Sequence, residues 1–397
     1  SGDMLEAALT AGLCSMGAKV IPLGVVPTPA VAYLTRYYKA DAGVVISASH
    51  NPCEYNGIKF FNSDGYKLSD GIENEIENYI LGEKAIEELP THGKVGYVSA
   101  NHNAVEDYVA FAVSTIDCRL DGMKIAVDCA NGASYETAFK ALNKLGANVE
   151  AIHNTPDGVN INHMCGSTHM ESLQAYVTSI GADIGIAFDG DADRMLAVDE
   201  NGNLIDGDQI MAACAKFMRD NGTLKQNTLV ATVMSNLGLF MAGEKIGINI
   251  PRTKVGDRYV LEEMLAKGYN IGGEQSGHII FLDHNTTGDG LVSALQFLSV
   301  LKKTGMKASE AASIVTVMPQ VLRNAVVKLE NKNSYMENEE IAAACKALED
   351  EFAGEGRVLI RPSGTEPLVR VMIEGKDEEY ITKKAEELAE LIEKILG

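Results

Sequence analysis

Residues 182–194 read Ala-Asp-Ile-Gly-Ile-Ala-Phe-Asp-Gly-Asp-Ala-Asp-Arg, an apolar run that leads into three aspartates at alternate positions. Residues 173–180, before this run, have a helical pattern, so the order is helix, buried strand and polar loop. The same order occurs 142 residues earlier, where residues 30–38, 40–47 and 48–52 give the corresponding helix, strand and loop. This recurrence predicts a repeated α/β unit.

A third, looser copy extends the repeat, with its helix at 259–267, its strand at 269–272 and its loop at 273–278. Alternating helices and strands at this spacing predict βαβ units with largely parallel sheets. Ligands bind at the carboxyl ends of such strands, which is where the three polar loops lie. A further strand-like segment precedes each helix: residues 19–23, 148–153 and 248–254.

The C-terminal part of the chain has a different pattern. Residues 368–373 alternate with period two, and residues 323–329 and 357–360 are also strand-like. Residues 378–396 form an amphipathic helix with one apolar face. We expect a separate, smaller α+β domain here, with the polar stretch 361–367 between two of its strands.

We therefore predict an α/β fold of three related α/β domains with mostly parallel mixed sheets, followed by a smaller C-terminal α+β domain. Ser49, the aspartates and residues 273–278 would each lie in a different α/β domain. The predicted domains are residues 1–119, 120–203, 204–314 and 315–397.

Composition narrows the class of protein. The chain has 397 residues, and its 34 Lys and Arg against 55 Asp and Glu give a net charge of −21. This charge argues against nucleic-acid or anionic-membrane partners, because the field of the protein repels polyanions. The sequence has no membrane-length apolar run, and we expect no secretory leader. Seven scattered cysteines without a CxxC pair indicate a reducing compartment, so we expect the cytoplasm.

Asp189, Asp191 and Asp193 are candidate metal ligands. Three close carboxylates repel one another, and a hard cation such as Mg²⁺ both neutralises them and prefers oxygen ligands. Arg194, next to them, is a candidate to bind a phosphate. A structural calcium site and a solvated acidic turn are the alternatives, although Arg194 occupies the position at which an EF-hand loop needs glycine.

Ser49 is the candidate nucleophile, because the repeat places it at a strand end equivalent to that of the aspartates. No G-x-S-x-G motif surrounds it, which disfavours acyl transfer. If the segment is extended, His50 points away from Ser49 and braces the loop. Lys59 is a better candidate for handling a proton or a phosphate.

Two further loops carry candidate binding residues. In the third loop, Glu274, Ser276 and His278 suit the recognition of vicinal hydroxyls. In the C-terminal domain, a glycine, two hydroxyls and two arginines suit an anion cradle, although a tight hairpin with incidental polarity is the alternative. The residues of this cradle are Arg361, Ser363, Gly364, Thr365 and Arg370.

Together these four loops resemble those of the α-D-phosphohexomutases. Residues 47–52 (Ser-Ala-Ser-His-Asn-Pro) resemble the phosphoserine loop of the family, and residues 189–194 (Asp-Gly-Asp-Ala-Asp-Arg) its metal loop. Residues 273–278 (Gly-Glu-Gln-Ser-Gly-His) resemble its sugar loop, and residues 361–367 (Arg-Pro-Ser-Gly-Thr-Glu-Pro) its phosphate loop. Gln275 and residues 253–259 and 365–372 most resemble the branch that acts on glucosamine phosphates.

The resemblance implies four domains around a central cleft and an isomerase that moves a phosphoryl group between C6 and C1 of a hexose. It implies a phosphate on Ser49, one Mg²⁺ per subunit held by Ser49 and the three aspartates, and glucosamine 1,6-bisphosphate as intermediate and activator. Lys59, His278 and Arg194 would assist catalysis. The other loop residues, with Asp257 and Arg258, would bind the substrate.

The partners expected are a small phosphosugar and a second copy of the chain in a homodimer. Phosphomannomutase or phosphoglucomutase activity is the alternative within the family. A metal-dependent phosphosugar phosphatase and a non-catalytic calcium-binding module are alternatives of other classes.

One departure from the family pattern concerns the first domain. The family begins with a strand that carries a Gly-Thr-Asp-Gly-x-Arg-Gly motif, followed by an Arg-Asp-Thr-Arg run before the Ser-Gly found here as Ser1 and Gly2. Neither motif is in the sequence, so we expect the first domain to lack its N-terminal part.

Overall fold

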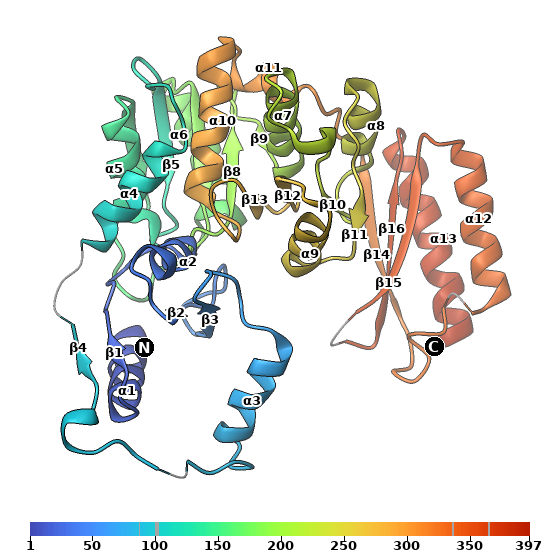
Figure 1. Cartoon of the computed structure of the whole chain (residues 1–397). Coiled ribbons are helices and arrows are strands. Elements are labelled where there is room, and N and C mark those ends of the chain that lie inside the picture. The colour runs from blue at the N-terminus through green and yellow to red at the C-terminus, as the bar shows by residue number, and fades with distance from the viewer. Residues whose placement is uncertain (87, 100–102, 336, 364–365) are drawn as a thin grey trace. The chain divides into compact units, whose positions relative to one another are not determined.

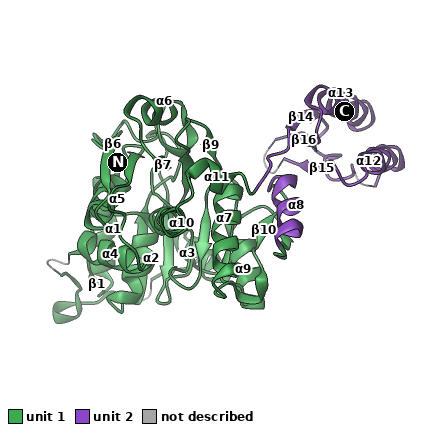
Figure 2. Ribbon diagram, turned by 90° about the horizontal axis from the view of Figure 1, so that it is seen from above, with its two compact units in different colours: residues 1–234, 247–314 green, residues 235–246, 315–397 purple. Residues whose placement is uncertain are grey.

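The structure of the chain, a computed structural model, describes residues 1–86, 88–99, 103–335, 337–363 and 366–397. The chain forms two compact units, coloured separately in Figure 2. Unit 1 contains residues 1–234 and 247–314, and unit 2 contains residues 235–246 and 315–397.

The N-terminal part of unit 1 presents the serine loop at the end of a short hairpin. Strand β2 (Ala42–Ile46) pairs in antiparallel fashion with β3 (Ile58–Asn62), and helix α2 (Thr28–Tyr37) packs against both strands. The polar loop that contains Ser49 therefore connects two paired strands. The other elements here are α1 (Gly2–Ser15), β1 (Lys19–Val20), α3 (Asp70–Ile80), β4 (Tyr97–Val98) and α4 (Ala104–Ser114), and β1 and β4 are parallel.

A five-stranded mixed sheet follows, in the order β6-β5-β7-β8-β9. Strand β7 (Ile184–Phe188), the predicted apolar strand, is buried throughout and parallel to β5 (Lys124–Asp128). Gly185 permits α6 (Glu171–Ile180) to pack closely, because a Cβ there would lie 2.5 Å from a methyl carbon of Val177. The remaining elements are α5 (Ser134–Lys144), β6 (Asn148–Ile152), β8 (Met195–Val198) and β9 (Leu204–Ile205).

The third part of unit 1 contains two small sheets. Strands β10 (Ala231–Thr232) and β11 (Arg252–Thr253) are parallel, whereas β12 (Ile271–Gly273) and β13 (Ile279–Phe281) form an antiparallel hairpin around the third loop. Helix α10 packs against α4, α7 and β8 and so connects this part to the rest of the unit, as Figure 1 shows. The helices are α7 (Gly207–Asp220), α9 (Asp257–Lys267), α10 (Gly290–Thr304) and α11 (Ala308–Ala312).

Unit 2 is the smaller α+β unit, with an antiparallel sheet in the order β14-β16-β15. Helix α13 (Glu378–Leu396) has the bounds that the sequence pattern predicts, and it buries Ile381, Ala385, Leu388 and Ile392 against the sheet. The other elements are α8 (Leu237–Ile246), β14 (Gln320–Val326), α12 (Glu339–Phe352), β15 (Arg357–Pro362) and β16 (Leu368–Glu374).

Helix α8 belongs to unit 2, although it falls within the predicted domain 204–314. Polar contacts explain this. The side chain of Asn236 bonds both the N–H and the C=O of Met318 at 2.9 Å, and the carboxylate of Glu374 accepts from the N–H of Leu237 at 3.3 Å. Sequence periodicity does not report such contacts.

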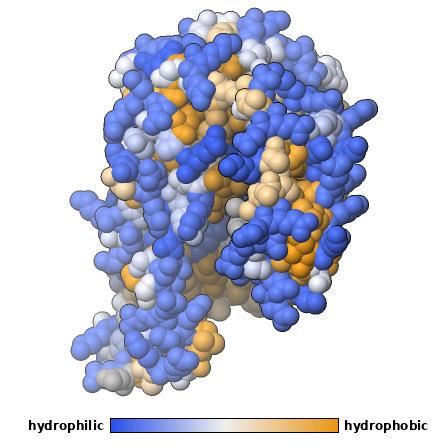
Figure 3. All heavy atoms as spheres, turned by 90° about the vertical axis from the view of Figure 1, so that its right-hand side faces the viewer, coloured by the Kyte–Doolittle hydropathy of each residue, from blue (hydrophilic) through white to orange (hydrophobic). Residues whose placement is uncertain are grey.

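The face in Figure 3 is hydrophilic over most of its area, with smaller hydrophobic areas between. Among the helices in the described part of the chain, none combines the length and the apolar character that crossing a membrane requires.

Candidate active site

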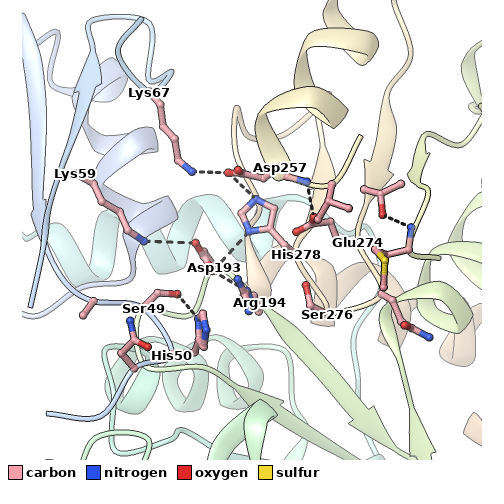
Figure 4. A pocket seen from close by; sticks show the side chains of 17 residues that line it. Ser49, His50, Lys59, Lys67, Asp193, Arg194, Asp257, Glu274, Ser276 and His278 are labelled. Carbon is pink, nitrogen blue, oxygen red and sulfur yellow. Dashed lines mark hydrogen bonds and ion pairs between the residues drawn. The ribbon is translucent and has the colours of Figure 1, made fainter. Parts of the chain in front are cut away.

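Three of the predicted loops meet in one pocket of unit 1, with a volume of about 670 Å³ (Figure 4). This volume is in the range of small-molecule sites. The pocket is lined by Ala48, Ser49, His50, Asn51, Lys59, Lys67, Asp193, Arg194, Thr232, Met234, Val255, Gly256, Asp257, Glu274, Gln275, Ser276 and His278.

The three aspartates follow β7 directly and are buried, with exposed fractions of 0% for Asp189, 2% for Asp191 and 5% for Asp193. One carboxylate oxygen of each lies within 4.8 Å of the others. Burial excludes the alternative of a solvated acidic turn. The loop joins two antiparallel strands, β7 and β8, so it is not an EF-hand, in which two helices flank the loop.

Two carboxylate oxygens of this triad are buried and make no hydrogen bond to the described residues. These are Asp191 Oδ1 and Asp193 Oδ1. An unsatisfied buried acceptor costs about 1–3 kcal/mol, and more when it is charged. The other oxygen of Asp191 accepts from Thr28 Oγ1 at 2.7 Å and from Lys59 Nζ at 2.6 Å. Hard oxygen donors held in this way fit a divalent metal ion.

Ser49 contacts the triad, although 140 residues separate it from Asp189 in the sequence. Its Oγ donates a hydrogen bond to Asp189 Oδ2 at 2.9 Å. Its backbone has φ +55°, in the left-handed region, and Ser47 Oγ accepts from its N–H at 2.9 Å. The expectation that His50 points away is wrong, since it assumed an extended backbone. His50 Nδ1 lies 3.5 Å from Ser49 Oγ, and burial together with the charge of Arg194 lowers the pKa of His50.

Neighbouring charges shift the pKa values of two aspartates of the triad in opposite directions. Burial and the charges of Asp193 and Asp191 raise the pKa of Asp189 well above its usual value. Burial also disfavours ionised Asp193, but His278, Lys59 and Arg194 outweigh it and lower the pKa of Asp193. A bound cation would favour the ionised form of all three carboxylates.

The Lys59 side chain forms ion pairs with two aspartates of the triad, which favour its protonated form. It lies 2.6 Å from Asp191 Oδ2 and 3.7 Å from Asp193 Oδ2. Burial works against its ammonium form, but these two carboxylates more than compensate, so the pKa of Lys59 is raised. Lys59 therefore contributes a positive charge to the lining of the pocket that Ser49 also lines.

His278 connects the metal loop to Asp257. Its Nδ1 lies 3.6 Å from Asp193 Oδ1, and its Nε2 lies 3.7 Å from Asp257 Oδ2. Burial alone would lower the pKa of His278, but Asp193 and Asp257 raise it. The backbone N–H of Gly288 donates to Nε2 at 3.2 Å, which fixes the plane of the ring.

The structure adds Lys67, which the sequence does not single out. Lys67 lines the pocket and pairs with Asp257. A turn closed by Asn62 Oδ1, which accepts from the N–H groups of Asp64 and Tyr66 at 3.0 Å, brings Lys67 back opposite Phe61. The Asn62-Ser63-Asp64-Gly65 stretch was the available signal, since it is typical of such turns.

Among the third-loop candidates, Glu274 and Ser276 line the pocket, and Glu274 Oε1 accepts from the N–H of Gly256 at 3.1 Å. Arg258 is not brought to the pocket lining. Its guanidinium pairs with Glu262 at 2.8 Å and with Asp70. Its predicted role in binding stays a prediction.

The phosphate-loop candidates lie in unit 2. Arg361 on β15 and Arg370 on β16 are directly opposite in the antiparallel register. Burial and the like charge of Arg370 lower the pKa of Arg361, an environment that favours an anion. The N–H of Ser363 donates to Leu368 O at 2.8 Å. The predicted residues Gly364 and Thr365 lie outside the described residues.

The chain matches models of a known protein family in four consecutive segments. Models of phosphoglucomutase/phosphomannomutase match the chain four times: the alpha/beta/alpha domains I, II and III at residues 1–87, 105–202 and 206–318, and the C-terminal domain at residues 325–391.

Curated relatives match over nearly the whole chain. The phosphoglucosamine mutase of Ruminiclostridium cellulolyticum is 63% identical over 393 residues, which are 99% of this chain and 88% of the relative. That of Acetivibrio thermocellus is 62% identical over 397 residues, 100% of this chain and 88% of the relative.

Solved structures share the fold at lower identity. A phosphoglucomutase/phosphomannomutase family protein from Burkholderia thailandensis superimposes with a TM-score of 0.79 at 23% identity, covering 99% of this chain and 86% of that one. An N-acetylphosphoglucosamine mutase from Aspergillus fumigatus, in complex with GlcNAc-6P and magnesium, gives 0.69 at 18% identity, with 100% of both chains covered.

Proposed function

The chain belongs to the phosphoglucomutase/phosphomannomutase family, and from this premise we propose that it interconverts glucosamine 6-phosphate and glucosamine 1-phosphate. Its high-identity relatives carry the corresponding name. The observation that carries the proposal is the 2.9 Å hydrogen bond from Ser49 Oγ to Asp189 Oδ2, which joins the candidate nucleophile to the candidate metal ligands.

The first step transfers phosphate from Ser49 to a sugar hydroxyl. The bond between phosphorus and Ser49 Oγ breaks, a bond between phosphorus and the sugar oxygen forms, and the proton of that hydroxyl ends on Ser49 Oγ. His50 Nδ1, 3.5 Å from Oγ, is placed to assist this proton movement. The product is glucosamine 1,6-bisphosphate, which turns around and returns its other phosphate to Ser49 in the reverse reaction.

Asp189, Asp191 and Asp193, with an oxygen at Ser49, would hold one Mg²⁺ per subunit. Asp191 Oδ1, which is buried and has no hydrogen-bond partner among the described residues, supports this assignment. When bound, the ion would offset the negative charge of the transferring phosphoryl group. Lys59 and Arg194 add positive charge on the side of the protein.

Glu274 and Ser276 would accept hydrogen bonds from sugar hydroxyls, and Asp257 and Arg258 would contribute to substrate binding in a lesser role. His278 would assist catalysis together with Lys59. The phosphate that does not react would bind the cradle of Arg361, Ser363, Gly364, Thr365 and Arg370. We further propose a cytoplasmic homodimer with domains 1–119, 120–203, 204–314 and 315–397.

A coupled assay on three substrates tests the proposal. Purified protein with Mg²⁺ should convert glucosamine 6-phosphate with a kcat/KM well above that for mannose 6-phosphate and glucose 6-phosphate. It should need only trace bisphosphate and release almost no inorganic phosphate. A preference for mannose or glucose phosphate would move the protein to another branch of the family, and stoichiometric phosphate release would make it a phosphatase.

A further inference from the structure

We propose that Asn162 is a positioning residue that holds the Ser49 loop in the conformation from which Ser49 exchanges phosphate. This inference rests on the proposed function of Ser49. Asn162 lies in the loop between β6 and α6, 113 residues after Ser49, and is 6% exposed. None of the four motif loops contains it.

The amide group of Asn162 bonds two carbonyls of the serine loop. Nδ2 donates to Ser49 O at 2.9 Å and to Asn51 O at 2.8 Å. Both hydrogens of the amide nitrogen are therefore used, one on the carbonyl of the nucleophile itself and one two residues later. No other residue type of this size offers two donors from one nitrogen.

The serine loop needs such an anchor because Ser49 has an unfavourable backbone conformation. Its φ of +55° is rarely adopted by residues other than glycine and asparagine. Relaxation to a negative φ would rotate the Ser49 side chain and move Oγ away from Asp189. A backbone held in this state therefore presets the position of the nucleophile.

Asn162 is itself held beside the metal loop by the segment that follows β5. Its N–H donates to Ala130 O at 2.9 Å, and its φ of +57° suits asparagine. A Cβ added to Gly190 would lie 2.6 Å from Asn162 Nδ2 and 2.7 Å from Ser49 O. Asn162 thus lies where the serine loop and the metal loop contact each other.

A buried carboxylate stabilises the segment that carries Asn162. Asp128 Oδ2 accepts from His153 Nδ1 at 2.9 Å and from the N–H of Gly166 at 3.0 Å, and Asp128 Oδ1 accepts from the N–H of Ala130 at 2.8 Å. Cys165 lies in the same cluster. Both oxygens of Asp128 have partners, unlike those of Asp191, whose Oδ1 has no hydrogen-bond partner among the described residues, so the cluster acts as a brace for residues 153–166.

Replacement of Asn162 by aspartate tests the inference, because N162D keeps the shape and removes both donors. The matched control is N131D. Asn131 has φ +47° and is 9% exposed, and its Nδ2 donates to Asn160 O at 3.5 Å rather than to the serine loop. Ser49 is phosphorylated with glucosamine 1,6-bisphosphate and followed by intact mass, and amide hydrogen exchange is measured over residues 47–53.

We expect N162D to phosphorylate Ser49 at least about 10-fold more slowly, because small misplacements of reacting groups carry large rate penalties. Its kcat should fall in parallel, its KM should change less than about threefold, and exchange over 47–53 should increase. N131D should match the wild type in all of these. If N162D does not fold, N162S, which retains one donor, should give an intermediate rate.

Equal phosphorylation rates and equal exchange in N162D and N131D would overturn the inference. Failure of the proposed function gives a different result, in which the wild type itself takes up no phosphate at Ser49. The exchange measurement then still reports whether Asn162 holds the loop.

Discussion

Ser49 Oγ donates a 2.9 Å hydrogen bond to Asp189 Oδ2, although 140 residues separate the two in the sequence. The bond joins a loop of the β2–β3 hairpin to the carboxyl end of the buried strand β7. A hydroxyl and a buried acidic cluster are therefore joined by a hydrogen bond, and the proposed phosphoryl transfer depends on this contact.

Replacement of Ser49 by alanine should abolish mutase turnover, because no other group in the proposal carries the phosphate. Only one hydrogen bond at a partly buried position is lost, so the free energy of unfolding should change by about 1 kcal/mol or less. A coupled assay and a urea titration measure both effects. Turnover within a few-fold of the wild type would remove Ser49 from its role.

Replacement of Asp191 by asparagine should weaken Mg²⁺ binding at least about 10-fold and lower kcat, since one charged ligand is lost. Asp283, which pairs with Lys225 outside the pocket, provides the control variant D283N. Isothermal titration with Mg²⁺ measures affinity without substrate. The same Mg²⁺ affinity in D191N and D283N would exclude the triad as the metal site.

Chelation should destabilise the protein, because the three buried carboxylates then repel one another without a counter-ion. Mg²⁺ at 100 times its Kd should stabilise the fold by about 2.7 kcal/mol. Thermal unfolding with EDTA and with excess Mg²⁺ measures the shift. D191N should lose most of the Mg²⁺-dependent increase in unfolding temperature. An equal shift in D191N and the wild type would point to a different binding site.

Replacement of Gly288 by alanine should displace His278. A Cβ at Gly288 would lie 2.5 Å from the Cε1 and Nε2 atoms of the imidazole ring. We expect a loss of about 1–3 kcal/mol of stability and a fall in kcat. Gly93, with no atom within 4 Å of an added Cβ, provides the control G93A. A G288A enzyme with full kcat would show that His278 has no part in the reaction.

Stability should fall as the pH rises above about 6.5, the ordinary pKa of histidine, because the hydrogen bond with Asp128 raises the pKa of His153 in the folded state. A raised pKa in the folded state means that the stabilisation is complete below the unfolded pKa and is lost as the pH rises through the folded pKa. Urea unfolding at pH 6 and pH 8 measures the decrease in the free energy of unfolding. H153Q should show a smaller pH-dependent decrease than H163Q, and equal decreases would contradict the brace.

Much of the fold was predictable because apolar periodicity decides it. The strand after residue 182 and the helix over 378–396 are read from their apolar spacing, and both are present as β7 and α13. The family resemblance is likewise confirmed. The aspartate triad was predictable as a unit because its members are neighbours in the sequence.

Other features depend on tertiary contacts or on a single backbone angle. The left-handed φ of Ser49 turns His50 toward the pocket, and periodicity contains no information on that angle. Lys67 reaches Asp257 only because a turn reverses the chain. Thr28 and Asn162 contact the metal and serine loops from distant segments, so no local pattern identifies them.

A single-turnover experiment tests the central claim most directly. Protein phosphorylated on Ser49 is mixed with an equal amount of glucosamine 6-phosphate and Mg²⁺, and both the protein mass and the sugar products are followed in time. The account predicts that phosphate leaves Ser49 transiently as glucosamine 1,6-bisphosphate appears and returns to Ser49 as glucosamine 1-phosphate forms, with almost no inorganic phosphate. Loss of the serine phosphate as inorganic phosphate, or turnover by protein that never carries phosphate on Ser49, would contradict it.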